Sequence, residues 1–321
     1  MDGTRQNTTP YVRIDHSNPQ HARTVLVDWM LGNACSYACS YCPKNLHDGS
    51  IRWQKTDDVL DLYRQMKGHY VDRLDKYVWL QFTGGEPTMH PRIIDLLRAA
   101  SAMGFRVSLI SNASRTVRFW HKIRDNLDSV ILTYHNEFAT LDHFVEVGNL
   151  LVDQMNVHIN VTMHPDRFDR TYEEAKALRA ALPTATITLK PLRVGFESEL
   201  YEYTPDQRNR LSKGVPTSIR STSITPRSTM QASTPEGGQD TLRANDFILR
   251  GINNWRGFQC NIGLESLRIK GSGEVLRAVC GVGGRIGHLG SAVALPDQAI
   301  QCTKASCACV ADILTTKARI G

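Results

Sequence analysis

The amino-acid sequence predicts an α/β protein whose larger part is a partial (β/α)6 TIM-like barrel and whose C-terminal part is a smaller domain. Short apolar, β-branched runs alternate with helix-period segments six times between about residue 22 and residue 195. Strands separated by single helices imply right-handed crossovers and a parallel sheet. Six such units are too few for a closed eight-fold barrel, so an open one is expected.

Each unit is located by the period of its apolar residues. Strands are expected within residues 24–31, 76–85, 106–113, 128–135, 157–164 and 185–192. Helices are expected between them, within residues 57–74, 91–104, 117–127, 140–154 and 172–182.

The domain boundaries follow from changes in composition. Residues 1–21 form a polar N-terminal arm, and the barrel is expected over residues 22–203. Residues 204–249 are rich in Ser, Thr, Pro and Gly and lack sustained periodicity, which predicts a flexible linker or a lid. Residues 250–321 are loop-rich, and "SLRIKGSGEVLRAVC" predicts a β-hairpin around its "GSG" turn.

Composition predicts neither a membrane protein nor a secreted one. The N-terminal residues lack the apolar core of a secretory signal, and no stretch reaches the roughly 18 apolar residues that span a bilayer. A cytoplasmic location, without a membrane partner, is therefore expected. The net charge of +6 fits either an ordinary solvated surface or an anionic partner such as a nucleotide or nucleic acid.

Three cysteines cluster in "CSYACSYC", directly after the first expected strand. Cys35, Cys39 and Cys42 fall at the carboxyl end of that strand, where α/β folds place their sites. A reducing compartment disfavours disulfides, and structural zinc requires a fourth ligand that is not nearby. Three thiolates suit a 4Fe–4S cluster that keeps one iron open.

A second motif, "TGGEPTMHP", follows the next expected strand. Its Gly84, Gly85, Glu86 and Pro87, together with the Cys-x3-Cys-x2-Cys spacing and an aromatic Tyr41 before the last cysteine, resemble the radical S-adenosylmethionine (SAM) superfamily. Glycines permit close approach of the backbone to a ligand, and a carboxylate accepts hydrogen bonds from an ammonium group.

The resemblance implies roles for individual residues. Cys35, Cys39 and Cys42 would hold the cluster, whose open iron would bind the amino and carboxylate groups of SAM. The other cofactor-binding candidates are Tyr41 near the adenine, Gly84, Gly85 and Glu86 at the methionine amine, and Ser111, Asn112 and His135 at the following strand ends. The alternative for His135 is a structural role, as a hydrogen-bonded polar residue at the end of a strand. Glu137, Met163, His164 and Lys190 lie at the same rim.

Five further cysteines lie in the C-terminal domain. Cys260, the hairpin and Cys280, followed by Cys302, Cys307 and Cys309, resemble the twitch or SPASM auxiliary-cluster extensions of radical SAM enzymes. The resemblance implies one auxiliary 4Fe–4S cluster, held by Cys260, Cys280 and two of the other three. A structural zinc site is the alternative.

The implied activity is reductive cleavage of SAM to a 5′-deoxyadenosyl radical, which takes hydrogen from an unactivated carbon. An amino-acid-like, nucleotide-linked or peptide substrate is expected, with a flavodoxin- or ferredoxin-type reductant and nucleic acid as a further candidate partner. The alternatives are a peptide (RiPP) maturase and, from another class, a non-catalytic iron–sulfur or zinc-binding redox or scaffold protein.

Overall fold

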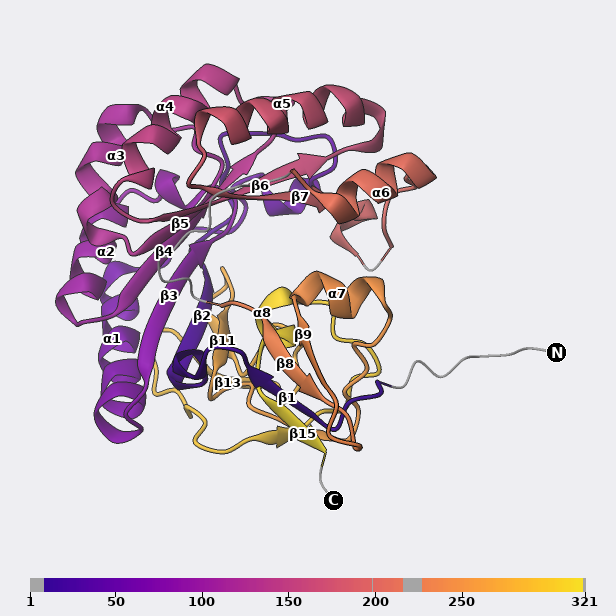
Figure 1. Cartoon of the computed structure of the whole chain (residues 1–321). Helices are drawn as coiled ribbons and strands as arrows, with labels where there is room; N and C mark the ends of the chain where they lie inside the picture. Colours follow the sequence, from indigo (N-terminus) through magenta and orange to yellow (C-terminus); the bar gives the residue numbers. More distant parts are fainter. Residues whose placement is uncertain (1–8, 198, 216–226, 320–321) are drawn as a thin grey trace. The chain divides into compact units, whose positions relative to one another are not determined.

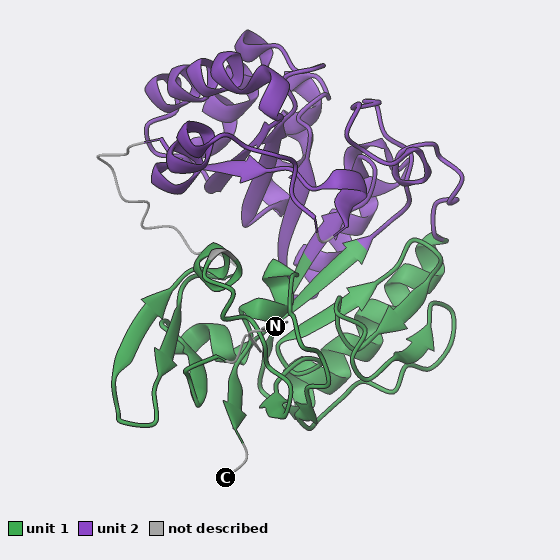
Figure 2. Cartoon of the chain, turned by 90° about the vertical axis from the view of Figure 1, so that its right-hand side faces the viewer, with its two compact units in different colours: residues 1–29, 55–80, 226–321 green, residues 30–54, 81–225 purple. Residues whose placement is uncertain are grey.

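The computed structural model describes residues 9–197, 199–215 and 227–319, and these form two compact units (Figure 2). Unit 1 contains residues up to 29, residues 55–80 and the residues after 225. Unit 2 contains residues 30–54 and 81–225.

The six expected strands are present, each within about two residues of its expected range. They are β2 (Thr24–Met30), β3 (Tyr77–Thr83), β4 (Arg106–Ser111), β5 (Ser129–Tyr134), β6 (Asn156–Met163) and β7 (Thr186–Pro191). Strands β4 to β7 pair in parallel and in sequence order. This confirms the α/β class. Among the described strands β7 pairs with β6 alone, so the strands do not close into a barrel.

The expected helices are also present. They are α1 (Thr56–Met66), α2 (Ile93–Ala102), α3 (Val117–Ile123), α4 (Leu141–Val152) and α5 (Phe168–Ala181), and α1 continues as a π-helix over Lys67–Arg73. Helices α2 to α5 cover the outer face of the unit 2 strands (Figure 1). Each buries an apolar stripe, which in α2 consists of Ile93, Leu96, Leu97 and Ala100.

The strands of unit 2 have one apolar and one polar face. In β6, Val157, Ile159 and Val161 are buried on one face. The residues that alternate with them, His158, Asn160 and Thr162, point to the opposite face because side chains alternate along a strand. The helices cover the apolar face. The polar face therefore remains available for a site at the carboxyl ends of the strands.

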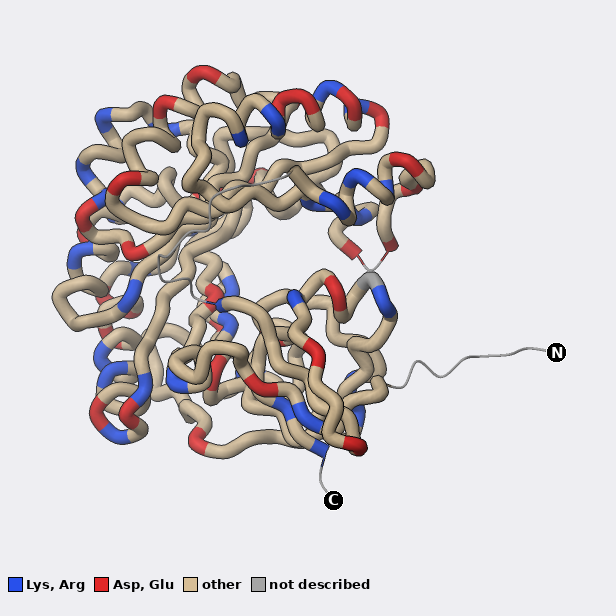
Figure 3. Tube along the Cα trace, in the orientation of Figure 1, with Lys and Arg blue, Asp and Glu red and all other residues tan. Residues whose placement is uncertain are grey.

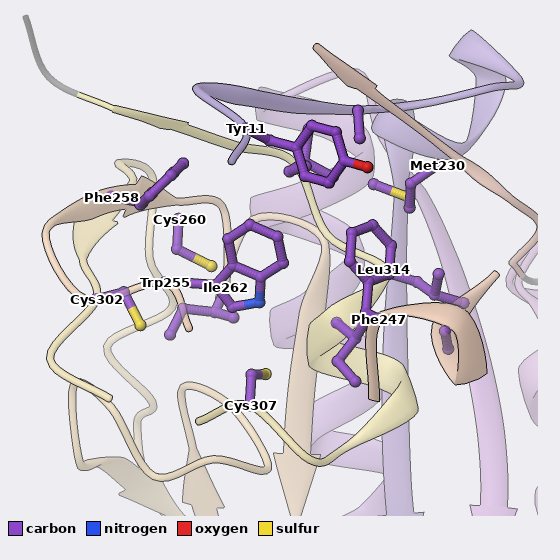
Figure 4. Close-up of a cluster of buried hydrophobic side chains, with 14 of the residues drawn as sticks. Tyr11, Met230, Phe247, Trp255, Phe258, Cys260, Ile262, Cys302, Cys307 and Leu314 are labelled. Atoms are coloured by element: carbon purple, nitrogen blue, oxygen red, sulfur yellow. The ribbon is translucent and has the colours of Figure 1, made fainter. Parts of the chain in front are cut away.

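Unit 1 is built around a six-stranded antiparallel sheet in the order β14-β10-β15-β1-β8-β9. Its strands are β14 (Ile300–Gln301), β10 (Phe258–Cys260), β15 (Lys317–Arg319), β1 (Arg13–His16), β8 (Met230–Ser233) and β9 (Gln239–Leu242). The short helix α8 (Val310–Ile313) precedes β15. A large apolar cluster that includes Trp255 and Phe258 packs in this unit (Figure 4).

The predicted hairpin is confirmed. Strands β11 (Ser266–Ile269) and β12 (Glu274–Leu276) pair antiparallel, and Gly273 supplies a positive φ of 91° at the turn. Strand β13 (Arg285–His288) extends the hairpin, and β11 pairs in parallel with β2.

The predicted linker or lid contains regular secondary structure over most of its described length, which the sequence analysis did not predict. Residues 204–249 contain α6 (Pro205–Lys213), β8, β9 and α7 (Ala244–Leu249), while residues 216–226 of the predicted linker lie outside the described residues. Strands of four residues are too short for a period to stand out in the sequence. The N-terminal arm likewise contributes β1, which pairs with both β8 and β15.

Charged residues of both signs are interspersed along both units (Figure 3). Within the described part of the chain, no helix is long and apolar enough to cross a membrane.

Candidate active site

The loop that carries the first three cysteines packs closely against the segment after β3. A Cβ atom added to Gly84 would lie 2.3 Å from the carbonyl oxygen of Gly32, and one added to Gly85 would lie 2.3 Å from that of Ala34. The backbone N–H of Glu86 also donates to the Ala34 carbonyl at 2.8 Å. The two glycines are therefore required for the "GGEP" segment to reach the cysteine loop.

Glu86 joins this segment to the end of β4. Its side chain is buried, and Oε1 accepts hydrogen bonds from the Thr88 N–H at 3.0 Å, the Thr88 hydroxyl at 2.6 Å and the Ser111 hydroxyl at 2.9 Å. Oε2 accepts from the backbone N–H of Asn112 at 2.7 Å. Burial raises the pKa of Glu86, and these donors oppose that shift. The carboxylate thus holds the β4 loop in place.

The β4 loop in turn contacts the cysteine loop. Nδ2 of Asn112 donates to the Ser36 hydroxyl at 3.0 Å and lies 3.7 Å from Sγ of Cys35. The hydroxyls of Ser36 and Ser114 are 2.7 Å apart. Asn112 therefore reaches a cysteine ligand candidate directly.

Tyr41 connects the cysteine loop to β5 and β6. Its hydroxyl oxygen lies 2.5 Å from Nδ1 of His135 and 3.0 Å from Oγ1 of Thr162, and Thr162 donates its own proton to the Tyr134 carbonyl. Thr162 must then accept from Tyr41, so Nδ1–H of His135 donates to the Tyr41 oxygen. Burial and the charge of Lys190 lower the pKa of His135 to about 4, which keeps the ring neutral.

The carboxylate of Glu137 binds Ser40, which lies between Cys39 and Cys42. Its carboxylate accepts from the Ser40 N–H at 2.8 Å and from the Ser40 hydroxyl at 2.5 Å, and Arg167 pairs with it at 3.0 Å. Although burial acts in the opposite direction, the Ser40 hydrogen bonds and the Arg167 charge lower the pKa of Glu137. An ionised Glu137 therefore restrains the cysteine loop.

The donor set suits an iron–sulfur cluster. Sγ of Cys35 accepts from the Tyr37 N–H at 3.4 Å, and hydrogen bonds to sulfur are among the features that tune such clusters. Burial raises the pKa of Cys39 and of Cys42 to about 11, so their thiolate forms need a positive centre. Among the described residues, no three His, Cys, Asp or Glu side chains are grouped to hold a single metal ion.

In unit 1, four of the five C-terminal cysteines share one apolar cluster. Cys260, Cys302 and Cys307 surround the Trp255 indole, and Cys280 packs against the same cluster (Figure 4). Nε1 of Trp255 is buried without a hydrogen-bond partner among the described residues. Such an orphaned donor fits a bound group with acceptor atoms, for example the sulfides of a cluster.

Cys309 is placed differently. It packs against the smaller cluster of Leu26, Trp79 and Ala311. Its side chain is partly buried, and this burial raises the pKa of the Cys309 thiol to about 12. Cys309 therefore lies in a different apolar cluster from the other four C-terminal cysteines.

A buried lysine lies in the same part of unit 1. Lys317 is 1% exposed, and its Nζ donates to the carbonyls of Asp312, Ile313 and Thr315 at 2.7, 2.9 and 2.8 Å. Its charge opposes the effect of burial on the pKa values of Cys302 and Cys307. A fixed positive charge of this kind would offset the negative charge of thiolates.

The candidate residues in unit 2 form one connected set. Through the contacts above, the cysteine loop is linked to Tyr41, Gly84, Gly85, Glu86, Ser111, Asn112 and His135. The sequence did not single out Ser36, Ser40, Thr162 and Arg167, nor Trp255 and Lys317 in unit 1. Thr162 had a usable signal, since it alternates with His158 and Asn160 on the polar face of β6.

Comparison with known families identifies the class of protein. A model of the Radical SAM superfamily matches residues 29–191, just over half of the chain. The chain therefore belongs to the radical SAM superfamily, whose members are enzymes that use a 4Fe–4S cluster and SAM.

Individual relatives match over shorter parts. An S-adenosylmethionine-dependent nucleotide dehydratase from Fibrobacter sp. (strain UWH6) is 28% identical over 94 residues, which are 29% of this chain and 28% of that protein. GTP 3′,8-cyclase from Chlorobaculum tepidum is 27% identical over 168 residues, 49% of this chain and 41% of that protein. The matched regions span less than half of either relative.

A solved structure supports the fold. The crystal structure of Streptococcus suis SuiB aligns with a TM-score of 0.50 at 13% identity, covering 83% of this chain and 63% of that one. At this identity the similarity concerns the fold alone.

Proposed function

We propose that this chain reductively cleaves SAM at a 4Fe–4S cluster held by Cys35, Cys39 and Cys42, within a partial (β/α)6 barrel, and that the resulting radical acts on a nucleotide-linked substrate. The observation that carries the proposal is the close packing of Gly84 and Gly85 against the cysteine loop. It brings the two motifs together at the carboxyl ends of the strands, as a shared SAM site requires.

Side chains and backbone groups of the protein would bind and orient SAM and the substrate, while the cofactor supplies the radical chemistry. When bound, the cluster supplies the electron that splits SAM into methionine and a 5′-deoxyadenosyl radical. The backbone at Gly84 and Gly85 is open to approach by the methionine amine, while Glu86 already accepts four hydrogen bonds from the chain. Glu86 would therefore act mainly by positioning Ser111 and Asn112.

The nucleotide-linked substrate is supported by the polar face of the sheet. His158 and Asn160 lie on that face of β6, and Lys190 on β7 lowers the pKa values of both His135 and His158 through its charge. Lys190 is exposed and would bind an anionic group such as a phosphate. The two curated relatives are by name a nucleotide dehydratase and a GTP cyclase.

A second, auxiliary 4Fe–4S cluster would be held by Cys260, Cys280, Cys302 and Cys307. Their common packing and the unpartnered Nε1 of Trp255 support this set over one that includes Cys309. About eight irons per chain with matching sulfide are expected after reconstitution, whereas zinc without sulfide would favour a structural site.

The test uses anaerobically reconstituted protein with SAM, dithionite and a panel of nucleotides deuterated on the ribose. Deuterium transfer into 5′-deoxyadenosine is expected with at least one nucleotide, and Lys190→Met should raise its KM at least about tenfold. If 5′-deoxyadenosine forms but never carries deuterium from any nucleotide, the nucleotide-linked substrate is wrong.

A further inference from the structure

Unit 2 has a groove of about 490 Å³. It is lined by residues of the segment after β3, the start of α2, the loop after β4 and helix α3. The side chains that matter for its chemistry are Met89, Ile94, Arg115, Arg118, Phe119 and Lys122. This site is called the basic groove below.

The charge of the groove is of one sign. Arg115, Arg118 and Lys122 are exposed, and no Asp or Glu is among the described residues that line the groove. None of the three cations forms an ion pair with another described residue, in contrast to Arg92 on the preceding segment, which pairs with Asp95 at 2.6 Å. Arg118 and Lys122 stand one turn apart on α3, an arrangement of like charges that costs stability unless a partner neutralises it.

Two apolar side chains also line the groove. Met89 is 37% exposed, and Ile94 is half-buried. The Arg115 guanidinium lies over the Phe119 ring, 4.7 Å from its centroid, which holds this cation at the rim. Exposed Met and Arg side chains are both enriched at protein–protein interfaces.

Both walls of the groove adjoin residues that contact the cysteine loop. On one wall, Arg115 follows Ser114, whose hydroxyl is 2.7 Å from that of Ser36. On the other, Thr88 binds Glu86, whose N–H donates to Ala34. Ala34 and Ser36 flank Cys35, so each wall of the groove is linked through these contacts to a neighbour of this cysteine.

We infer that the basic groove docks an acidic protein electron carrier, one that holds a low-potential flavin or iron–sulfur centre. This inference rests on the proposed function, which needs such a reductant. In each docking event the carrier loses one electron and the cluster at Cys35, Cys39 and Cys42 gains it, with no proton or atom transferred. Opposite charges on the two surfaces would speed the encounter.

Nucleic acid fits the groove less well than a protein. Binding of single strands uses exposed aromatic side chains on which bases stack. Phe119 is the aromatic residue among the groove-lining residues, and it is buried. The exposed apolar residue is Met89 instead.

The experiment compares Arg118→Gln/Lys122→Gln with the charge-matched control Arg170→Gln/Lys176→Gln on α5. Each protein is reconstituted and assayed for 5′-deoxyadenosine with a reduced flavodoxin or with dithionite, a small reductant that needs no docking surface. Binding of oxidised flavodoxin is measured separately by calorimetry at low and high salt, so one readout does not depend on turnover.

With flavodoxin, the α3 double variant should bind about fivefold more weakly and turn over correspondingly slower at low salt, with a smaller salt dependence than the wild type. Its dithionite-driven rate and the α5 control should match the wild type. Unchanged flavodoxin binding by the α3 double variant would overturn the inference. If the wild type forms no 5′-deoxyadenosine even with dithionite, the proposed function fails, while the calorimetry still tests the groove.

Discussion

Nδ1 of His135 lies 2.5 Å from the hydroxyl oxygen of Tyr41, although 94 residues separate the two in the sequence. The contact ties the cysteine loop to the end of β5, and the hydrogen bond from Tyr41 to Thr162 extends it to β6. One side chain between Cys39 and Cys42 is thus held by two neighbouring strands. The cysteine loop owes its position to contacts of this kind.

Replacing Tyr41 with Phe removes the hydroxyl and leaves the Nδ1–H of His135 without its acceptor. We expect a loss of about 1 to 3 kcal/mol in the free energy of unfolding and a weaker affinity for SAM. Urea unfolding and equilibrium dialysis with SAM measure the two effects. Tyr77→Phe, at a half-exposed tyrosine, should change neither.

Replacing Glu137 with Ala removes the acceptor for the Ser40 N–H and hydroxyl and frees the segment between Cys39 and Cys42. Partners of metal ligands typically contribute 10- to 100-fold to metal affinity, so iron should dissociate from the first site about that much more readily. Iron and sulfide per chain after gel filtration report the loss. Glu173→Ala on α5 is the control, and an equal iron content in both variants would contradict the assigned role.

The ionisation of Glu265 in unit 1 should make the free energy of unfolding depend on pH. Despite its burial, the hydrogen bond from His16 at 2.9 Å and the charges around it lower the pKa of Glu265 to about 2. A lowered pKa means that the stabilisation is complete above the ordinary carboxyl value of 4.5 and is lost as the pH falls toward 2.

The wild type should therefore lose up to about 3 kcal/mol more than Glu265→Gln between pH 4.5 and pH 2. Urea unfolding of both proteins across this range gives the difference. If the free energy of unfolding changed equally with pH in both proteins, Glu265 would not be the group that causes the pH dependence.

Lys317 should matter for both stability and redox properties. Lys317→Met removes one donor from three buried carbonyls, of which, among the described residues, only that of Asp312 keeps a second donor, the Thr315 hydroxyl. We expect a loss of about 3 to 5 kcal/mol in the free energy of unfolding. If the four cysteines hold an auxiliary cluster, removing the positive charge should also lower its midpoint potential. Unfolding and redox titration test the two effects, with the half-exposed Lys270→Met as the control.

The parts of the molecule that depend on local sequence could be predicted. Six strands were located because each has an apolar period of its own, and the cysteine spacing and the "GGEP" segment are short motifs that need no tertiary information. The four-residue strands β8 and β9 could not be found in the same way, because they gain stability only by pairing with β1 and with each other.

The contacts between the motifs also could not be predicted from the sequence. Glu137 lies 97 residues from Ser40, and Thr162 lies 121 residues from Tyr41, so the register of β5 and β6 decides that they meet. The separation of Cys309 from the other C-terminal cysteines likewise depends on which core each side chain enters.

The most direct test of the central claim is the formation of 5′-deoxyadenosine by the reconstituted protein with SAM and dithionite under anaerobic conditions. The wild type should form it, and Cys39→Ala should reduce the rate to background while Cys309→Ala should leave it unchanged. Formation at the wild-type rate by Cys39→Ala would contradict the assignment of the cluster to this loop.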